Sequence, residues 1–289
     1  MGGGRPRDRR HTDVTLTLTL RTAPTVPLEA DVLSPDRLSG VSALEAAKLT
    51  VVHGNQRADL GEFFQVGGAA DGELHLTGDL AQVKQIGTGM ARGRIVVHGS
   101  VGMHLGAGMT GGEIVVEGDA GDWVGPEMSG GRIVVKGNAG HMLGSARRGS
   151  QIGVRGGEIV VFGNAGNEVG NGMRRGLIAI GGDAGDFAGV NMLAGTIVVL
   201  GRLAWRAGAG MRRGSIISMH PAELLPTFSY ACDYAPEFLR VCLRHVRGLG
   251  LTIADSHVNG RYQRWCGDGI ELNRGEVLIL DSAGTASRS

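Results

Sequence analysis

Three pairs of adjacent arginines are the residues of this chain best suited to binding a ligand. They are Arg147 and Arg148, Arg174 and Arg175, and Arg212 and Arg213. The second and third pairs each directly follow a methionine, at equivalent places in a repeated pattern. Guanidinium groups bind carboxylate and phosphate oxygens through paired hydrogen bonds. We predict a basic edge that binds a polyanion or the carboxylates of a partner; the alternative is a solvated corner that keeps the protein soluble.

A glycine motif in this chain matches the sequence pattern of a nucleotide-binding site. Residues 106–111 read Gly-Ala-Gly-Met-Thr-Gly, which fits the dinucleotide pattern G-x-G-x-x-G. A true fingerprint opens a helix, whereas an apolar strand-like run follows here. The same glycines recur near residues 87, 170 and 208. The motif is therefore predicted to be a corner of a repeat and not a nucleotide site.

Other residue types that could support catalysis or bind metal lack the required arrangement. Asp255, Ser256 and His257 are triad residue types, but neighbours in a strand point to opposite faces and the nucleophile elbow is missing. The carboxylates that a polysaccharide-cleaving site would need are scattered along the repeats. The histidines beyond the N-terminal tail share no repeat column around which a metal could bind; they stand at positions 53, 75, 98, 104, 141, 220, 245 and 257. We predict no catalytic residue and no metal ligand on this chain.

Composition narrows the class of protein further. The 29 basic and 28 acidic residues give a formal charge of +1, which argues against a nucleic-acid-binding arm. The three cysteines, at 232, 242 and 266, have no C-x-x-C spacing, so we expect reduced thiols. No run approaches the roughly 18 apolar residues of a membrane span, and the start lacks the apolar core of a signal peptide. We predict a cytoplasmic protein that binds neither membrane nor nucleic acid.

A repeat decides the expected fold. A short apolar run, typified by Arg-Ile-Val-Val-His over residues 94–98, recurs with its first isoleucine at positions 95, 114, 133, 159, 178, 197 and 216. Five intervals are 19 residues and one is 26, which places an insertion near residues 145–151. Glycine, at 52 of 289 residues, exceeds its usual share of about 7% and marks the corners between runs.

Such a repeat predicts an all-β protein, a single-stranded β-helix or solenoid of seven to eight coils. One coil buries too few aliphatic side chains to offset the conformational entropy of ordering 19 residues. Stacked coils overcome this because each strand pairs with its neighbours about 4.8 Å away. The repeat does not determine the handedness of the helix.

Period-two alternation assigns the faces of the coils. Ile95 and Val97 and their equivalents point inward, whereas Arg94, Val96 and His98 and their equivalents point outward. The column of Arg94 alternates in charge, which favours ion pairs between coils. An outward apolar stripe needs a cover, either the chain's own ends or another subunit; we predict that partner subunits dock along it. The stripe comprises Val96, Val115, Val134, Val160, Ala179, Val198 and Ile217.

The two ends of the chain depart from the repeat and are expected to cap it. Residues 15–20 alternate like a strand, and Ser42 with Glu45 forms a capping-box pattern. Residues 236–247 predict an amphipathic helix stopped by Gly248, and residues 275–280 a final strand. The predicted organisation is a disordered tail over 1–12, an N-terminal cap over 13–70, the repeat over 71–220, a C-terminal cap over 221–281 and a second disordered tail over 282–289.

The repeat pattern G-x-G-M-x-x-G-x-I-V-V-x-G-x-A-G resembles the glycine-rich β-helix domain shared by glutamate synthase C-termini and the C subunit of formylmethanofuran dehydrogenase. The closing segment, Arg-Tyr-Gln-Arg-Trp-Cys-Gly-Asp over 261–268 followed by Gly275 and Glu276, is similar to that of the C subunit. So is the entry, Pro-Asp-Arg-Leu-Ser-Gly over 35–40 and Val-His-Gly-Asn over 52–55. The resemblance covers roughly residues 14–281.

This resemblance implies a role in one-carbon metabolism. Methanogens use a molybdenum or tungsten dehydrogenase, and methylotrophic bacteria a formyltransferase/hydrolase complex that converts formyl-tetrahydromethanopterin to formate through formyl-methanofuran. The arginine-rich composition favours the bacterial complex. In both, the resemblance implies a scaffold without cofactor or metal, beside subunits A, B and D that carry the reacting centres. The arginine pairs would then hold the glutamate tail of a methanofuran-type cofactor.

Three classes of protein remain open on the sequence. The first is a non-catalytic scaffold subunit of such a formyl-transfer complex, hydrolytic or redox. The second is a structural β-helix subunit of the glutamate synthase type, and the third is a β-helix enzyme in its own right. Neighbouring genes for a formyltransferase and an amidohydrolase-like subunit would select the first, and a neighbouring amidotransferase domain the second.

Overall fold

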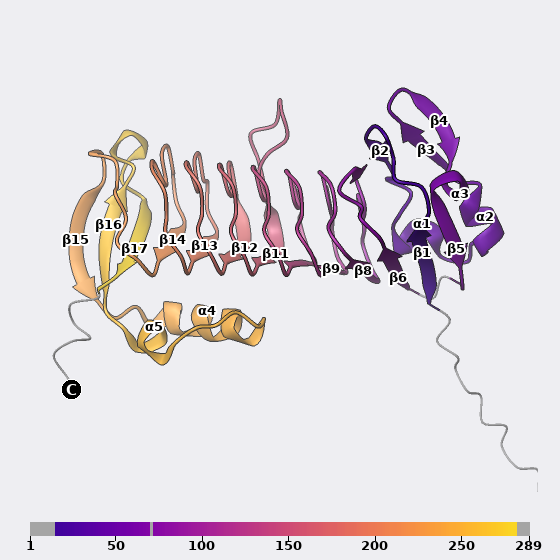
Figure 1. The fold of residues 1–289 in the computed structure, drawn as a ribbon. Helices are drawn as coiled ribbons and strands as arrows, with labels where there is room; N and C mark the ends of the chain where they lie inside the picture. Colours follow the sequence, from indigo (N-terminus) through magenta and orange to yellow (C-terminus); the bar gives the residue numbers. More distant parts are fainter. Residues whose placement is uncertain (1–14, 70–71, 282–289) are drawn as a thin grey trace, which may run out of the picture.

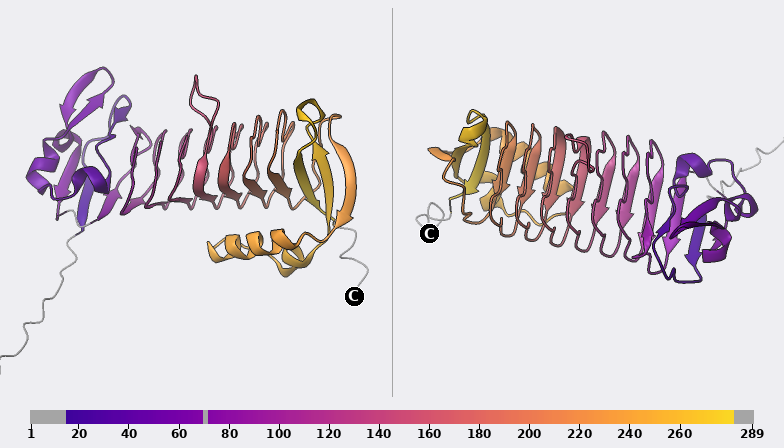
Figure 2. Two further views of the ribbon diagram at one scale, coloured as in Figure 1. Left: turned by 180° about the vertical axis from the view of Figure 1, so that it is seen from behind. Right: turned by 90° about the horizontal axis from the view of Figure 1, so that it is seen from above.

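The computed structural model describes residues 15–69 and 72–281. It shows a long rod of stacked coils, with helices at its N-terminal end and along one side (Figures 1 and 2). Most described residues in regular structure lie in strands, which confirms the predicted all-β class. The two predicted disordered tails, 1–12 and 282–289, lie outside the described residues.

The principal sheet has 13 strands in the order β15-β16-β17-β14-β13-β12-β11-β10-β9-β8-β6-β1-β5. Their bounds are β1 Leu16–Leu20, β5 Phe64–Gly67, β6 Glu73–Thr77, β8 Arg94–His98, β9 Glu113–Val116, β10 Arg132–Val135, β11 Arg155–Val161, β12 Arg175–Ile180, β13 Thr196–Val199, β14 Ser215–Ser218, β15 Ser229–Tyr234, β16 Tyr262–Gly267 and β17 Gly275–Leu280. A second sheet near the N-terminus contains β2 Leu28–Glu29, β3 Thr50–His53, β4 Gln56–Asp59 and β7 Val83–Lys84.

Five α-helices accompany these strands in the described part of the chain. They are α1 Pro35–Leu38, α2 Ala43–Ala47, α3 Leu60–Phe63, α4 Glu237–Gly248 and α5 Asp255–Asn259. The capping box predicted at Ser42 is present, because the Ser42 hydroxyl accepts from the Glu45 amide and the Glu45 carboxylate accepts from the Ser42 amide. The predicted helix over 236–247 is confirmed as α4, and the predicted final strand as β17.

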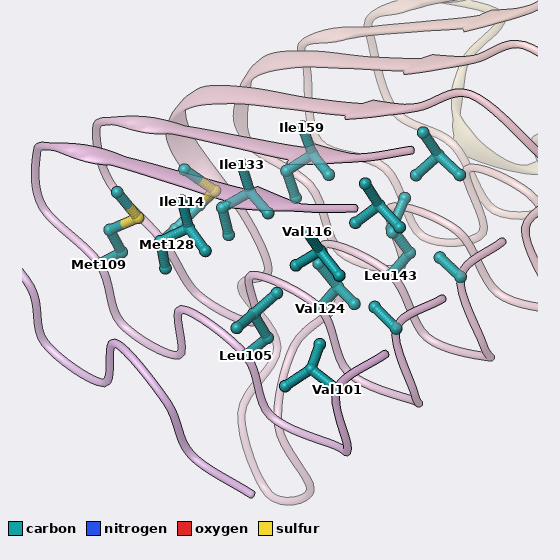
Figure 3. Close-up of a cluster of buried hydrophobic side chains, with 14 of the residues drawn as sticks. Val101, Leu105, Met109, Ile114, Val116, Val124, Met128, Ile133, Leu143 and Ile159 are labelled. Atoms are coloured by element: carbon teal, nitrogen blue, oxygen red, sulfur yellow. The ribbon is translucent and has the colours of Figure 1, made fainter. Parts of the chain in front are cut away.

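The repeated runs pair in parallel and in register, as the alternation predicts. Ile133 of β10 lies beside Ile114 of β9 and Ile159 of β11, and these inward isoleucines are fully buried. Leucines, valines and methionines from the other walls of the coils complete the core (Figure 3). The core is continuous along the rod, because each coil contributes the same few aliphatic side chains to the next.

Outward charges also pair as predicted. Arg94 Nε lies 3.1 Å from Glu113 Oε2, and Arg132 Nε lies 2.9 Å from Glu158 Oε2. These groups are partly exposed, so each pair contributes only a few tenths of a kcal/mol up to about 1 kcal/mol. Because the opposite charges lie directly across from each other, they favour the observed register of neighbouring strands.

Two polar ladders run along a corner of the rod, where side chains of one coil accept from backbone amides of the next. In the first, the Asn164 amide donates to Asn138 Oδ1 at 2.9 Å, and the Asp183 amide donates to Asn164 Oδ1 at 2.8 Å. The second joins Asp122, His141, Asn167, Asp186 and Trp205 in the same way. The aspartates that seemed scattered in the sequence therefore stand in two columns, and their role is structural.

The ladders explain two columns of repeated glycines, one beside each ladder. A Cβ added at Gly163 would lie 2.5 Å from Asn138 Oδ1, a distance that real Cβ atoms do not reach. The ladder side chain of one coil occupies the space where the next coil would carry a side chain. Glycine is required there by close approach of the chain to itself, not by ligand binding.

Removing one ladder side chain should destabilise the protein measurably. Asn164→Ala deletes the acceptor of the Asp183 amide, and one hydrogen bond contributes about 1 kcal/mol. We expect the free energy of unfolding, measured by urea denaturation, to fall by about that amount. Asn259→Ala, an exposed position without a side-chain hydrogen bond in the described structure, is the matched control; an equal loss in both variants would contradict the ladder's role.

The predicted docking of partner subunits along the outward apolar stripe is wrong for most of its length. Helix α4 and the segment after it lie along this face of the sheet (Figures 1 and 2). Leu239, Leu243 and Val246 of α4 form one buried cluster with Val134, Val160, Ala179, Val198 and Ile217. The chain's own C-terminal end covers the stripe, because an amphipathic helix places its apolar face on the nearest exposed apolar surface. Val96, outside this cluster, is only 6% exposed, and Val115 packs against the cluster's edge.

A polar contact fixes α4 along the rod. His245 Nε2 of the helix lies 2.5 Å from Glu158 Oε1, while Arg132 Nε donates to the other oxygen of the same carboxylate. Burial acts to raise the pKa of Glu158, but the hydrogen bonds from His245 and Arg132 outweigh it and hold that pKa below its ordinary value. The Glu158 carboxylate therefore stays charged where the helix crosses the sheet.

An arginine-lined groove as the candidate functional site

Four of the six predicted arginines surround one hollow on the edge of the rod. Arg174 and Arg175 stand at the start of β12, and Arg212 and Arg213 stand in the equivalent place before β14. Strand β13 lies between β12 and β14, so the two pairs are about 10 Å apart at the backbone. The intervening coil supplies Leu193 and Ala194 there, which leaves room between the arginine pairs.

The hollow has a volume of about 530 Å³ and is bordered also by the connection between β16 and β17. From this connection, Glu271, Leu272 and Arg274 line it. Arg212 Nε lies 3.1 Å from Glu271 Oε2, so one guanidinium is already engaged by a carboxylate. Arg174, Arg175, Arg213 and Arg274 are exposed and have no ion pair with any residue that the structure describes. A ligand entering here meets several unneutralised positive charges.

A second hollow continues the first toward the insertion in the repeat. It is lined by Leu193, Arg212 and Glu271 from the first hollow and by amide and hydroxyl side chains from the neighbouring coils, Ser150, Gln151, Asn171 and Asn191. We call the two hollows together the arginine groove. One half offers guanidinium groups, which bind carboxylates or phosphates. The other half offers amides, which donate to and accept from peptide-like groups.

Arg147 and Arg148 do not line this groove. They lie in the inserted loop, which projects from the rod before β11 (Figure 1). The Arg147 amide donates to Glu127 Oε1 at 3.2 Å, and its guanidinium lies 3.9 Å from the same carboxylate. This contact turns Arg147 toward the preceding coil. The structure therefore separates this pair from the other four arginines.

Sequence reasoning missed Arg274 and Glu271, which line the groove. Strand β17 pairs with β14 so that Glu276 lies beside Ser215, which places Arg274 next to Arg213. Arg155 lies beside Arg175 in the pairing of β11 with β12. Arg155 is the first residue of β11 and is not among the residues that line the two hollows. Nothing in the repeat indicates Arg274, because β17 departs from the 19-residue period.

The other constellations that the sequence suggested form no comparable site. His75 Nδ1 lies 2.9 Å from His98 Nε2, and the two rings are flanked by Glu73 and Glu117; these histidines meet diagonally although they share no column. Residues 255–257 form part of helix α5 rather than the predicted strand, and Asp255 pairs with Arg247. Among the described residues, no group of three or more His, Cys, Asp or Glu side chains is arranged to hold a metal ion.

No helix in the described part of the chain is both long and apolar enough to cross a membrane. The three cysteines are free, with Cys232 exposed and the others partly buried. Burial raises the pKa of Cys242 to about 11. Its thiol is therefore protonated at neutral pH and unreactive.

Fold and groove together define an all-β protein built from stacked coils. An arginine-lined groove lies at one edge of the stack, and helix α4 covers the outward apolar face of the sheet. A solved structure has the same architecture: a chain of the formyltransferase/hydrolase complex FhcABCD from Methylorubrum extorquens in complex with methylofuran, at a TM-score of 0.85 and 35% identity, over 91% of this chain and 98% of that one. The chain belongs to the C-subunit family of formylmethanofuran dehydrogenases and the related formyltransferase/hydrolase complexes.

Curated relatives support the same family over shorter stretches. The C subunit of the molybdenum-containing formylmethanofuran dehydrogenase 1 of Methanothermobacter thermautotrophicus is 46% identical over 82 residues, 28% of this chain and 20% of the relative. The C subunit of the tungsten-containing dehydrogenase 2 of the same organism is 42% identical over 95 residues, 31% of this chain and 35% of the relative. These matches span about a fifth to a third of each relative's length. No family model matches the chain.

Proposed function

We propose that this chain is the non-catalytic scaffold subunit of a cytoplasmic formyltransferase/hydrolase complex, with subunits A, B and D as its partners. The observation that carries the proposal is the likeness over 98% of the Methylorubrum extorquens chain, whose complex was solved with methylofuran. The complex would convert formyl-tetrahydromethanopterin to formate through a formyl-methanofuran-type intermediate. The rod would be a single-stranded β-helix of seven to eight coils, with its two ends as caps.

The scaffold role is supported by the structural contacts that the polar residues of the repeat make between coils. The aspartates and asparagines of the repeat accept from backbone amides of the next coil, and the glutamates of the outward column pair with arginines. These contacts stabilise the stack of coils. We infer that the reacting centres, the metals and the tetrahydromethanopterin-type cofactor belong to the partner chains.

The arginine groove is the proposed contact of this chain with a cofactor. Methanofuran-type cofactors carry glutamate residues, so their tails present carboxylates on a peptide-like chain. The groove supplies guanidinium groups in one half and amide side chains in the other, which matches both kinds of group. The predicted binders are Arg174, Arg175, Arg212 and Arg213, with Arg147 and Arg148 placed to contact a tail only beyond the groove.

Co-purification from the native host tests the scaffold proposal. The tagged full chain should retain formyltransferase and amidohydrolase-like subunits, with zinc and without molybdenum or tungsten in metal analysis of the same sample. Molybdenum or tungsten with iron–sulfur subunits would select the alternative, the C subunit of a dehydrogenase. An amidotransferase partner would select a glutamate-synthase-type structural subunit, and a chain that retains no partner would contradict the proposal.

Charge reversal tests the groove. In the complex, Arg174→Glu with Arg213→Glu should weaken retention of a methanofuran-type cofactor by at least about 100-fold, since each charged hydrogen bond contributes roughly 1.5–3 kcal/mol and 1.4 kcal/mol corresponds to tenfold. Cofactor content of the purified complex is the measurement. Arg57→Glu with Arg202→Glu makes the same change in net charge at exposed positions outside the groove and is the control. Unchanged cofactor content in the groove variant would refute the assignment.

A further inference from the structure

The turn between β16 and β17 exposes two aliphatic side chains beside the arginine groove. Ile270 is 77% exposed and Leu272 is 70% exposed, among the highest values for large hydrophobic side chains in the described structure. We call residues 269–273 the apolar turn. Because Leu272 also lines the groove, the turn and the groove form one continuous surface.

The apolar turn is held rigidly. Asp268 is only 2% exposed, and its carboxylate accepts from the Gly210 amide at 3.0 Å and from the Ile270 amide at 3.2 Å. The Asp268 carbonyl accepts from the amides of Glu271 and Asn273. Burial acts to raise the pKa of Asp268, but its hydrogen bonds outweigh burial and lower it. A buried, charged anchor therefore ties the turn to the coil before β14.

The residue at the tip of the turn is locally unfavourable. Leu272 has φ +70° and ψ 20°, the left-handed region that disfavours side chains other than those of glycine, asparagine and aspartate. Asparagine or glycine would satisfy the same backbone and would also suit an exposed turn. The chain instead carries a strained, exposed leucine on a fixed support, and such a combination marks a residue that contacts something else.

Charge around the turn indicates the kind of partner. Arg274 follows the turn directly, and Arg174, Arg175 and Arg213 line the adjoining hollow; none is neutralised by a described residue. An apolar centre within a charged rim is the common anatomy of a protein interface. The rim is positive here, so the complementary surface is negative.

We propose that the apolar turn docks into an apolar socket bordered by carboxylates on a partner subunit of the same complex. The proposal rests on the subunit role proposed above. Ile270 and Leu272 fill the socket, and Arg274 pairs with its acidic border. The partner then lies against the end of the arginine groove, so a ligand tail held by the groove sits at the junction of two subunits.

The first test separates docking from folding. Leu272→Asn removes the aliphatic side chain and puts a residue that favours positive φ in its place, so we expect the melting temperature to stay the same or rise. Combined with Ile270→Ser in the tagged full chain, expressed in its own host, it should lower the apparent affinity for the partner subunit by about tenfold or more. Leu44→Asn in α2, 80% exposed at the opposite end of the rod, is the matched control and should change neither quantity.

The second test identifies the occupant. A photo-crosslinking amino acid at position 272 should join the chain to a peptide of a co-purifying subunit that contains aspartate or glutamate. Crosslinks to a second copy of this chain or to phospholipid would overturn the proposal, as would full partner retention by the folded double variant. Those results leave the subunit role intact, whereas a wild-type chain that retains no partner contradicts the subunit role and the docking proposal together.

Discussion

Replacing Leu243 with aspartate is expected to release helix α4 from the sheet while the coils stay folded. Leu243 is fully buried in the cluster that joins α4 to the outward faces of β10–β14. Truncating a buried leucine to alanine already costs about 2–5 kcal/mol, and a carboxylate at that place must also be desolvated. The coils do not depend on α4 for their strand pairing or for their internal core, so the loss should be local.

Hydrogen exchange measures this release directly. We take the substitution to lower the free energy that holds α4 on the sheet by about 3 kcal/mol. The amides of residues 239–248 should then exchange at least 100-fold faster in the variant, because 1.4 kcal/mol corresponds to tenfold. The newly exposed valine stripe should also bind a hydrophobic dye. Val241→Asp is the matched control, because Val241 lies on the outer face of the same helix and is 70% exposed. Equal protection of α4 in both variants would contradict the packing described here.

The coils were predictable from the sequence because each repeat has the same residue types at the same spacing. The isoleucine spacing of 19 residues gives the register, the alternation gives the inward face, and both are confirmed in the pairing of Ile95, Ile114 and Ile133. Only the purpose of the polar columns was missed. To predict the ladders between side chains and backbone amides, one must know which residues of adjacent coils lie at the same corner. The period of the strands does not give that information.

The cover of the stripe was harder to predict because it joins two features that are distant in the chain. The sequence shows an apolar outward stripe and, separately, an amphipathic helix with Leu239, Leu243 and Val246 on one side. Both the stripe and the apolar side of the helix need to be buried. No local sequence feature indicates that they pack against each other. The connection depends on the path through β15, which turns back before α4 and pairs with β16 at the end of the sheet. Without that path, the sequence is equally consistent with burial of the apolar stripe by a partner subunit and with burial by the chain's own helix.

The groove was predictable in part for the same reason. Arg174, Arg175, Arg212 and Arg213 occupy equivalent places in the repeat, so the repeat alone brings them to one edge. Glu271 and Arg274 reach that edge through β17, which joins the stack out of period after the chain has left it. The separation of Arg147 and Arg148 depends on the path of the inserted loop, which has no counterpart in the other coils.

The glycine motif at residues 106–111 yields the second large effect. Gly106 has φ +62°, and a Cβ there would lie 2.5 Å from Ile133 Cδ1 in the core. Gly89, which stands in the preceding coil at the place equivalent to Gly108, has nearly the same φ, +68°, but a Cβ there would meet nothing within 4 Å. Gly89→Ala should therefore cost only the strain of the left-handed conformation, about 1–2 kcal/mol. Gly106→Ala should cost a further 1–3 kcal/mol or so for overpacking.

Urea denaturation of the two alanine variants compares these costs, and the comparison decides what the motif is. If the glycines serve the stack, the Gly106 variant loses more unfolding free energy than the Gly89 variant, and neither the wild type nor the variants bind NADH or ATP. If they formed a phosphate-binding loop, nucleotide would raise the melting temperature of the wild type, and Gly106→Ala would abolish that shift. The isoleucine packed against Gly106 favours the first result, since the space that a pyrophosphate would need beside this glycine is filled from within the rod.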